Sequence, residues 1–413
     1  MAGRLHAGRR VPRARAATHP PVCGRWPTGK ENSMTDTSAF IEPLDVLSLR
    51  GNRLFGDPGS WGESPMPPPP TVAAGALRSH LLARTGVDLA AFAKGDAEHP
   101  AMGTRDRPGT FTLAAFQLAR RYEDGLVEPL YPLPADLVVN GTNETRRIEQ
   151  LVPARIDALA GSNPLPLWPV LAQADERGKP VTGLWLTADG LRAWMGAGAI
   201  DAARHLVASD SLWKTEARVG VGLDAARRRA DDGKLFSLQA VSFARDAGFA
   251  VRVGGSELSE GVLRFGGDGR GARLDPARVD WPEPDWDAIA GARCGRLLLT
   301  TPGIFERGWL PTGAGDPSPA EGAAFDLHGV RGRIICAAVP RADVVSGWDL
   351  ARWQPKPAQR SAPTGSVYWL DELEATPAAL RKLVETGLWT EPQYNTDMRR
   401  AEGFNRLALA QWR

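Results

Sequence analysis

Cysteine and histidine are scarce in this sequence, and their spacing excludes several kinds of site. The 413 residues include three cysteines, Cys23, Cys294 and Cys336, which lie far apart and form no Cys-x-x-Cys pair. This spacing predicts neither a disulfide framework nor a zinc ribbon, and it fits a reducing cytoplasm. The six histidines form no His-Glu-x-x-His motif, and no two of them are four residues apart. We therefore expect no bound metal and no cofactor.

Long apolar runs and the common catalytic motifs are also absent. No stretch of about 18 apolar residues occurs, so no membrane-spanning helix is expected. There is no Walker lysine loop and no Gly-x-Ser-x-Gly motif, and Gly220-Val221-Gly222 lacks the third glycine of a dinucleotide loop. Asp231 and Asp232 precede Gly233, which is a pattern typical of a turn rather than of a metal site. These absences predict a protein that is not an enzyme and has no small-molecule substrate.

The small net charge of +2 hides an uneven distribution. Residues 1–33 hold seven arginines and lysines and one glutamate, so this segment carries +6 and the residues from Met34 onward carry −4. A basic arm can bind nucleic acid or act as a transit peptide. This segment has no helical period and no apolar core, which favours a disordered leader or a true start at Met34. Any nucleic-acid contact of the remaining chain must then use local clusters of arginines.

Hydrophobic residues make up 43% of the sequence, enough for two or three packed domains. Periodicity predicts strands at residues 44–49 and 216–223, a paired ladder of 237–243 with 249–253, and a last strand at 405–411. Helices are expected at 72–84, with Thr71 as N-cap, and at 188–195 and 376–385. Residues 262–287 are rich in glycine, aspartate and proline and indicate a boundary. Because strands and helices do not alternate regularly, an α+β fold is favoured over a doubly wound sheet.

Two basic segments are candidates for RNA contacts. Arg227, Arg228 and Arg229, followed by Lys234, flank a predicted turn and would form the tip of a hairpin, either as a phosphate clamp or as a solvated face. Residues 398–406 place Gly403 between arginines just before the last strand. There, backbone amides can reach phosphate oxygens, although an ordinary turn explains the pattern equally well.

Several segments, in this order, resemble the RAMP superfamily, and within it the third subunit of type III-B CRISPR Cmr effector complexes. The resemblance runs from about residue 44 to the end, and its combination of segments is more specific than any one of them. The similar segments are Arg50–Phe55, Pro67–Arg78, Tyr131–Leu137, Glu216–Asp224, Asp232–Phe236, Leu299–Phe305, Gly308–Pro311, Ser346–Leu350, Pro355–Pro357 and Pro363–Trp369. The sequence departs from the superfamily in its glycine-rich loop, where only Gly387 and Gly403 remain before the last strand.

The resemblance implies two ferredoxin-like (RRM-like) domains, an N-terminal one at 34–287 with insertions and a C-terminal one at 288–413. It implies a non-catalytic subunit that grips the 5′ repeat-derived tag of the guide (CRISPR) RNA in antiviral defence. Its expected partners are the large polymerase-like Cmr subunit and the first backbone RAMP subunit. The expected RNA-binding residues are Arg50, Arg53, Gly75, Arg78, Arg218, Arg227, Arg228, Arg229, Lys234, Gly403 and Arg406.

The expected path of the tag crosses the first helix and the final loop, which is residues 398–406. A helix that begins near Pro70 offers free amides to a phosphate, Gly75 would let a second backbone approach, and Arg78 would reach the next phosphate. Docking of the final loop beside this helix would bring Gly403 and Arg406 to the same strip. The opposing interpretation has Gly75 packed on a sheet and Arg78 paired with a surface carboxylate.

Two other functions fit the same sequence. A RAMP endoribonuclease that processes guide precursors would need a general base near the glycine-rich loop, and His80 is the one candidate. A purely structural subunit would contact no RNA at all. Incubation with repeat RNA distinguishes the first alternative, and crosslinking within the assembled complex distinguishes the second.

Removal of residues 1–33 tests the interpretation of the basic leader. A chain that starts at Met34 should fold with an unchanged melting temperature and join its complex, because the deleted segment has no predicted core. Thermal unfolding and co-purification with the complex measure the two properties. Loss of folding or of assembly in the shortened chain would show that the leader is part of the functional protein.

Overall fold

The chain is an assembly of antiparallel sheets with few helices, which confirms the predicted α+β class. The computed structural model describes residues 36–49, 61–62, 64–142, 144–157, 159, 161–171, 179–224, 226–227, 229–349 and 351–412, with the backbone alone for Trp61 and residues 230–234. The predicted leader, residues 1–33, lies outside the described residues. No helix in the described part is long and apolar enough to cross a membrane.

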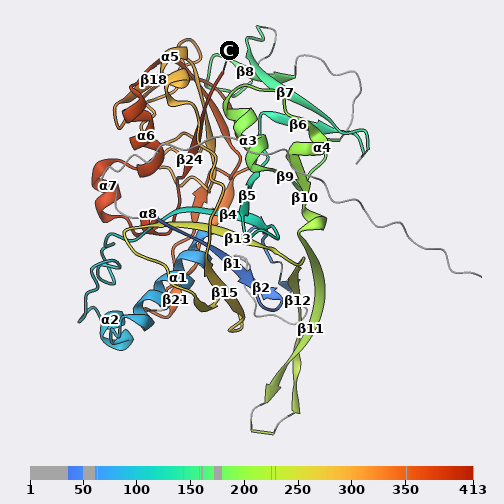
Figure 1. Cartoon of the computed structure of the whole chain (residues 1–413), viewed down its shortest axis with the longest axis vertical. Coiled ribbons are helices and arrows are strands. Elements are labelled where there is room, and N and C mark those ends of the chain that lie inside the picture. Colours follow the sequence, from blue (N-terminus) through green and yellow to red (C-terminus); the bar gives the residue numbers. More distant parts are fainter. Residues whose placement is uncertain are drawn as a thin grey trace, which may run out of the picture. The chain divides into compact units, whose positions relative to one another are not determined.

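The largest sheet has eight strands and is built mainly from the N-terminal part of the chain (Figure 1). Its central strands pair antiparallel in the order β15-β1-β13-β4. In spatial order the strands are β10 (Leu206–Ala208), β9 (Leu184–Leu186), β5 (Val127–Pro132), β4 (Thr112–Arg121), β13 (Ala247–Gly254), β1 (Thr37–Pro43), β15 (Gly271–Pro276) and β14 (Gly261–Arg264).

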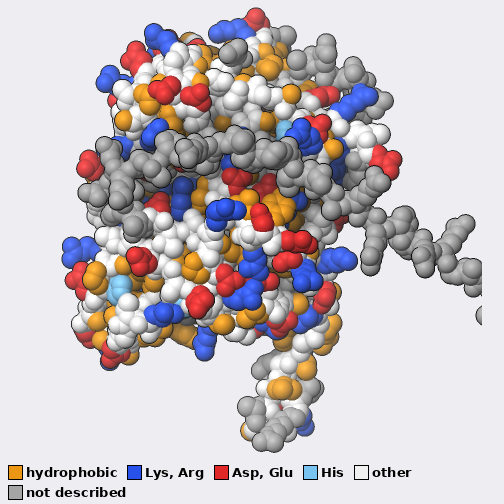
Figure 2. All heavy atoms as spheres, viewed as in Figure 1, with side chains coloured by type: hydrophobic (Ala, Val, Ile, Leu, Met, Phe, Trp, Pro, Cys, Tyr) orange, Lys and Arg blue, Asp and Glu red, His pale blue; other side chains and the backbone are white. Residues whose placement is uncertain are grey.

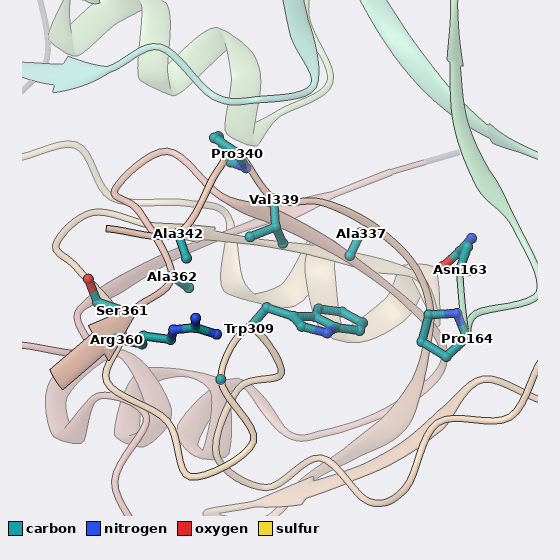
Figure 3. A pocket seen from close by; sticks show the side chains of 11 residues that line it. Asn163, Pro164, Trp309, Ala337, Val339, Pro340, Ala342, Arg360, Ser361 and Ala362 are labelled. Carbon is teal, nitrogen blue, oxygen red and sulfur yellow. The ribbon is translucent and has the colours of Figure 1, made fainter. Parts of the chain in front are cut away.

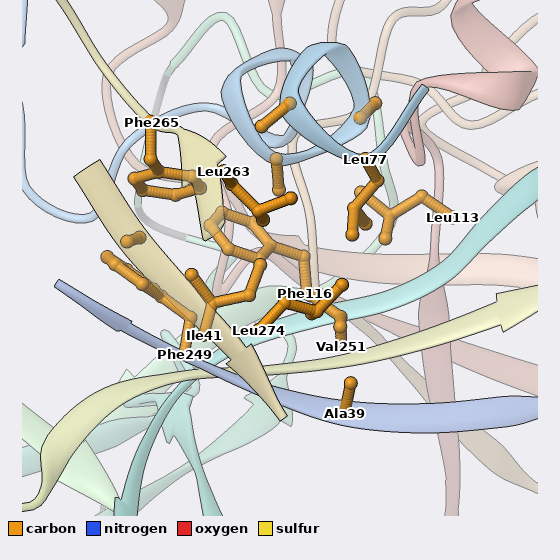
Figure 4. Close-up of a cluster of buried hydrophobic side chains, with 14 of the residues drawn as sticks. Ala39, Ile41, Leu77, Leu113, Phe116, Phe249, Val251, Leu263, Phe265 and Leu274 are labelled. Carbon is orange, nitrogen blue, oxygen red and sulfur yellow. The ribbon is translucent and has the colours of Figure 1, made fainter. Parts of the chain in front are cut away.

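Helix α1 (Pro70–Arg84) covers one face of this sheet and contacts β4 and β14. It begins at a proline, which suits the first turn because that position needs no amide hydrogen bond. Its buried residues include Ala73, Leu77 and Leu81, which are four apart and therefore share one face. Figure 4 shows Leu77 pointing into the core that lies between this helix and the sheet.

Aromatic side chains fill the same core. The rings of Phe116 and Phe249 stack with their centres 5.1 Å apart, and the ring centre of Phe265 lies 5.4 Å from that of Phe249. Figure 4 shows the three side chains. Full burial of one such side chain contributes roughly 1.5–3 kcal/mol relative to exposure, so this cluster fixes α1 firmly on the sheet.

A long insertion separates β4 from β13 in the sequence. Besides β5, β9 and β10 of the large sheet, its described residues form a three-stranded sheet, the helical segments α3, α4 and η1, and a hairpin that projects from the sheets in Figure 1. The hairpin strands are β11 (Trp213–Asp224) and β12 (Arg229–Phe243), and β12 also pairs with β2 (Leu47–Ser48) and β3 (Trp61–Gly62). The other inserted elements are β6 (Leu137–Asn140), β7 (Arg147–Ala154), β8 (Trp168–Leu171), α3 (Ala188–Met195), α4 (Ala202–His205) and η1 (Ser209–Ser211).

The C-terminal part of the chain forms a five-stranded antiparallel sheet. Helices α5 and α6 pack together, and both contact β24. The strands in spatial order are β17 (Ala323–Leu327), β18 (Val330–Ala338), β23 (Val367–Glu374), β16 (Gly295–Leu299) and β24 (Leu407–Gln411). The helices of this part are α5 (Trp286–Ala292), α6 (Pro377–Thr386), α7 (Glu391–Thr396) and α8 (Met398–Ala401).

The remaining described elements are one short helix and two small two-stranded ribbons. Helix α2 (Leu89–Lys94) follows α1 and is capped by the Asp88 carboxylate. Two small ribbons lie between β18 and β23 in the sequence. They are β19 (Asp343–Val345) with β22 (Gln359–Ser361), and β20 (Trp348–Asp349) with β21 (Gln354–Pro355).

The two main sheets share one strand order. If the strands β1, β4, β13 and β15 are numbered 1 to 4 along the sequence, their order across the sheet is 4-1-3-2. The strands β16, β18, β23 and β24, numbered in the same way, have the same order. The N-terminal set keeps α1 between its first and second strands, whereas the C-terminal set keeps α6 between its third and fourth. The division of the chain between residues 287 and 288 stays a prediction.

A buried ion pair joins the insertion to the C-terminal sheet. The Arg296 guanidinium of β16 donates from Nη1 to Asp136 Oδ2 at 2.8 Å, and both side chains are almost fully buried. The indole Nε1 of Trp194 in α3 donates to Asp136 Oδ1 at 3.0 Å. Arg296 Nη2 donates to the Trp194 carbonyl oxygen, and the guanidinium carbon lies 4.3 Å from the centre of the indole ring. Burial lowers the pKa of Arg296, and Asp136 opposes that shift.

Several predicted elements differ from those observed. The first strand is Thr37–Pro43, and of the predicted strand 44–49 only Leu47–Ser48 form a strand, β2, because Leu44 and Asp45 form a bend. Residues 237–243 pair with β11, and β13 pairs instead with β1 and β4. Thr71 is not the N-cap of α1, since that position is Pro69. Residues 231–233 continue β12 rather than forming the predicted turn, which lies between Asp224 and Arg229.

Replacement of Asp136 by alanine tests the buried network. Loss of the carboxylate leaves the Arg296 guanidinium buried without its counter-charge, and we expect a destabilisation of about 3–5 kcal/mol. The control is Asp189→Ala on α3, where the carboxylate pairs with Arg192 at 2.9 Å but is 75% exposed. That change should alter the free energy of unfolding by about 1 kcal/mol or less. Equal effects of the two substitutions in denaturant unfolding would show that the network does not join the two parts.

Candidate nucleic-acid interface

Arg78 of α1 is a half-buried cation that lacks a partner of its own. Among the described residues its guanidinium makes no hydrogen bond and no ion pair. Burial is the main cause that lowers the pKa of Arg78, Arg400 lowers it further, and the charge of Glu402 opposes both. An arginine in this setting is still charged at neutral pH, so it can attract an anion at little further cost in desolvation.

Glu402 cannot serve as a dedicated partner for Arg78. Its carboxylate forms an ion pair with Lys356 and a second one with Arg399, whose Nη1 lies 3.0 Å from Glu402 Oε2. Three cations therefore share a single buried carboxylate. This arrangement leaves a local excess of positive charge between α1 and the final loop, where the sequence predicted a strip of RNA contacts.

The final loop is fixed to the first sheet by hydrogen bonds. Arg400 in α8 donates from Nη1 to the Phe111 carbonyl oxygen at 3.0 Å and from Nη2 to the Gly109 carbonyl oxygen at 3.0 Å. Gly403 has φ +85°, and a Cβ there would lie 2.9 Å from the Leu113 carbonyl oxygen. Gly403 is therefore required for close packing of the loop on β4, which is a structural reason for a glycine at this position.

Two other predicted RNA-binding residues lie in different settings. Gly75 is exposed on α1, and an added Cβ there would meet no described atom within 4 Å, so the opposing interpretation that Gly75 packs on a sheet is wrong. Arg406 is 3% exposed and lies in a cavity next to β4, β13 and α6 rather than on the surface of α1. Arg406 therefore does not lie on the predicted strip, whereas Gly75 is exposed on the same helix as Arg78. RNA contact by these residues stays a prediction.

The remaining predicted residues belong to the hairpin or lie outside the described residues. Arg218 on β11 is exposed and donates to Glu216 at 3.2 Å. Arg227 is exposed at the tip, 3.8 Å from the Asp224 carboxylate, and Arg229 is the exposed first residue of β12. Arg50, Arg53 and Arg228 lie outside the described residues, as does the side chain of Lys234.

The distal half of the hairpin exposes apolar side chains on one face. Val219 is 69% exposed and Leu223 is 68% exposed, and Val221 lies opposite Leu235, which is 57% exposed. Figure 2 shows hydrophobic side chains along the projecting ribbon. A ribbon with arginines at the tip and apolar residues along its length suits contact with stacked bases and phosphates at once.

Aromatic residues in the C-terminal part form two further features that sequence reasoning missed. The exposed indoles of Trp348 and Trp353 meet edge to face, 6.0 Å apart, on the small β20–β21 ribbon. Trp309 and Arg360, with Ala337 near the end of β18, line a cavity of about 400 Å³. Figure 3 shows these side chains around it. The available signal was tryptophan beside glycine in two loop segments, Gly308-Trp309 and Gly347-Trp348.

Within the described residues, no group of three or more histidine, cysteine, aspartate or glutamate side chains gathers to hold an ion. The absence of a metal from the protein stays a prediction. His80 on α1 packs against Gly261 of β14, and burial lowers its pKa. The imidazole therefore faces β14 instead of the final loop.

Comparison with known families identifies the chain. The family described as CRISPR-associated protein (Cas_Cmr3) matches residues 39–412, which is nearly the whole described fold. The chain belongs to the Cas_Cmr3 family. This assignment confirms the resemblance seen in the sequence. No curated protein matches the chain in sequence.

Two solved structures resemble this Cas_Cmr3 chain at 14% identity. One is a cryo-EM structure of the type III-B Cmr-beta complex bound to cognate target RNA and AMPPnP, and the other shows Cmr-beta bound to cognate target RNA. Each similarity covers 91% of this chain and 99% of the other, with TM-scores of 0.45 and 0.44 respectively.

Proposed function

We propose that this chain is a non-catalytic, RNA-binding subunit of a type III-B CRISPR effector complex, and that it grips the 5′ tag of the guide RNA between α1 and the final loop. The observation that carries the proposal is Arg78, a desolvated guanidinium without an ion pair among the described residues, beside a carboxylate that two other cations already share. A phosphate of the RNA backbone would supply the missing negative charge. Membership of the Cas_Cmr3 family supports the assignment to a CRISPR effector.

The proposal includes two ferredoxin-like domains. Their support is the strand order that β15-β1-β13-β4 and β24-β16-β23-β18 share. Each set retains one of the two helices of a β-α-β-β-α-β unit, α1 in the first and α6 in the second. In this arrangement the final loop, which precedes the last strand of the second unit, is anchored through Arg400 to the start of β4, the second strand of the first unit.

The hairpin provides a second point of contact with RNA. Its tip arginines would bind phosphates, and its exposed apolar face would pack against unstacked bases or against a neighbouring subunit. The large polymerase-like subunit and the first backbone subunit are the proposed neighbours, and they would carry the chemistry of the complex. The endoribonuclease alternative gains no support from His80, because that imidazole packs on β14.

Replacement of Arg78 by methionine tests the α1 site. The change keeps the aliphatic stem and removes the charge, so the melting temperature should hardly change while affinity for tagged guide RNA falls roughly tenfold, the equivalent of about 1.4 kcal/mol. Affinity for the same RNA without its tag should change little. Fluorescence anisotropy and thermal unfolding give the two readouts.

Arg84→Met is the matched control, because Arg84 lies on the same helix and donates to the Glu260 carbonyl oxygen. It should leave the affinity for both RNAs near the wild-type values. If Arg78→Met bound tagged RNA as tightly as the control does, α1 would not be the tag site.

Replacement of Arg227, Arg228 and Arg229 together by alanine tests the hairpin tip. If each arginine neutralises one phosphate of single-stranded RNA, the slope of log affinity against log salt should shrink by about 2. The control removes three exposed arginines outside the hairpin, Arg245, Arg278 and Arg293, so both variants lose the same charge. Identical salt slopes in the two variants, with unchanged assembly, would mean that the tip is only a solvated surface.

A further inference from the structure

A cavity of about 200 Å³ lies where the first sheet meets the C-terminal part of the chain. Its walls come from β4, β5, α3 and β13 on one side and from α6 and β24 on the other. The polar residues that line it are Gln117, Tyr131, Arg252, Glu283, Thr300, Arg381, Glu385 and Arg406. Glu283 and Glu385 are exposed at the rim, whereas Arg406 is only 3% exposed.

Arg406 presents two free donors inside this region. Its Nη1 donates to the Glu385 carbonyl oxygen at 2.8 Å, whereas buried Nε and Nη2 have no hydrogen-bond partner among the described residues. These two N–H groups lie on the same edge of the planar guanidinium, which is the edge that grips two oxygens of one anion. Burial lowers the pKa of Arg406 to about 10, so the side chain is still cationic at neutral pH.

Arg252 adds a second cation. Its buried Nε has no hydrogen-bond partner in the described structure, but it lies 3.9 Å from Asp36 Oδ2 in a long ion pair. Its guanidinium lies 5.5 Å from the centre of the Trp281 ring, which orients it without neutralising it. Buried N–H donors without partners are costly, so the two unpaired donors of Arg406, beside a second cation on the same cavity, indicate that an anion completes the site.

The rim offers a surface for a flat ring. Trp286 lines the opening, and the Arg381 guanidinium lies 5.8 Å from the centre of its ring. A ligand with an anionic group at one end and a planar group at the other would therefore contact Arg406 at the floor and Trp286 at the mouth.

We propose that this cavity binds the phosphate group of a nucleotide, with Nε and Nη2 of Arg406 as its main donors and Arg252 as a second cation. The site is separate from the α1 strip and does not depend on the proposed function. The phosphate could belong to a free nucleotide or to an RNA chain, and both offer the same oxygens to the two arginines.

Thermal unfolding of the full chain with small probes tests the proposal. Sodium phosphate and adenosine monophosphate should raise the melting temperature by roughly 2–5 °C near saturation. Sodium chloride at equal ionic strength and adenosine should not, because they lack the tetrahedral anion. A further arm adds tagged guide RNA. A shift with the small probes identifies a free-nucleotide site, and a shift with RNA alone that requires Arg406 identifies a backbone phosphate.

Arg406→Met should abolish the phosphate-dependent shift, and Arg252→Met should weaken it severalfold, while the Arg84→Met control keeps the full shift. If Arg406→Met fails to fold, Arg252→Met decides the question. The proposal is overturned if no phosphate-bearing probe stabilises the wild-type chain more than chloride and adenosine do, or if the folded arginine variants keep the wild-type shift. Because inorganic phosphate is the primary probe, a failed α1 prediction would leave this result unaffected.

Discussion

The buried ion pair between Asp136 and Arg296 holds together the parts of the fold on which every other feature depends. Asp136 follows β5 in the inserted region, and Arg296 lies in β16, the first strand of the C-terminal sheet. Trp194 of α3 binds both partners, so insertion, helix and sheet meet at one point. An ion pair this deeply buried contributes little net stability, but its partners cannot separate without leaving a charge in the core. It therefore fixes how the C-terminal strands lie against the first sheet.

Two other consequences follow from that fixed relation. Arg400 can reach carbonyl oxygens beside β4, which places the final loop next to α1 and Arg78. The same packing encloses Arg406 and Arg252 around a cavity between β13 and α6. Arginines thus have different roles in this structure. Arg400, whose guanidinium nitrogens all donate to carbonyl oxygens, stabilises the fold. Arg406 keeps two donors without partners among the described residues, and these are the donors that we propose for phosphate.

The sequence predicted the elements whose signals are local. Helix α1 and helix α6 follow from proline at the start and apolar periodicity, and the basic hairpin tip follows from alternating strands around Arg227. Strand pairing is a property of the whole chain, which explains why 237–243 was paired with the wrong neighbour. The burial of Arg406 could not be predicted either, because the local sequence around an arginine before a strand is the same whether its side chain is exposed or lies in a cavity. The resemblance to a family predicted the identity of the chain, which no local pattern did, because it rests on the order of many segments that are each weakly similar.

The most direct test of RNA binding along α1 is crosslinking within the assembled complex. Guide RNA with photoreactive nucleotides in its 5′ tag would be crosslinked to the complex, and the crosslinked peptides of this chain mapped by mass spectrometry. We expect crosslinks in Pro70–Arg84 and in residues 398–406. Crosslinks of the tag confined to other surfaces of this chain, or to other subunits alone, would show that the tag does not lie along α1.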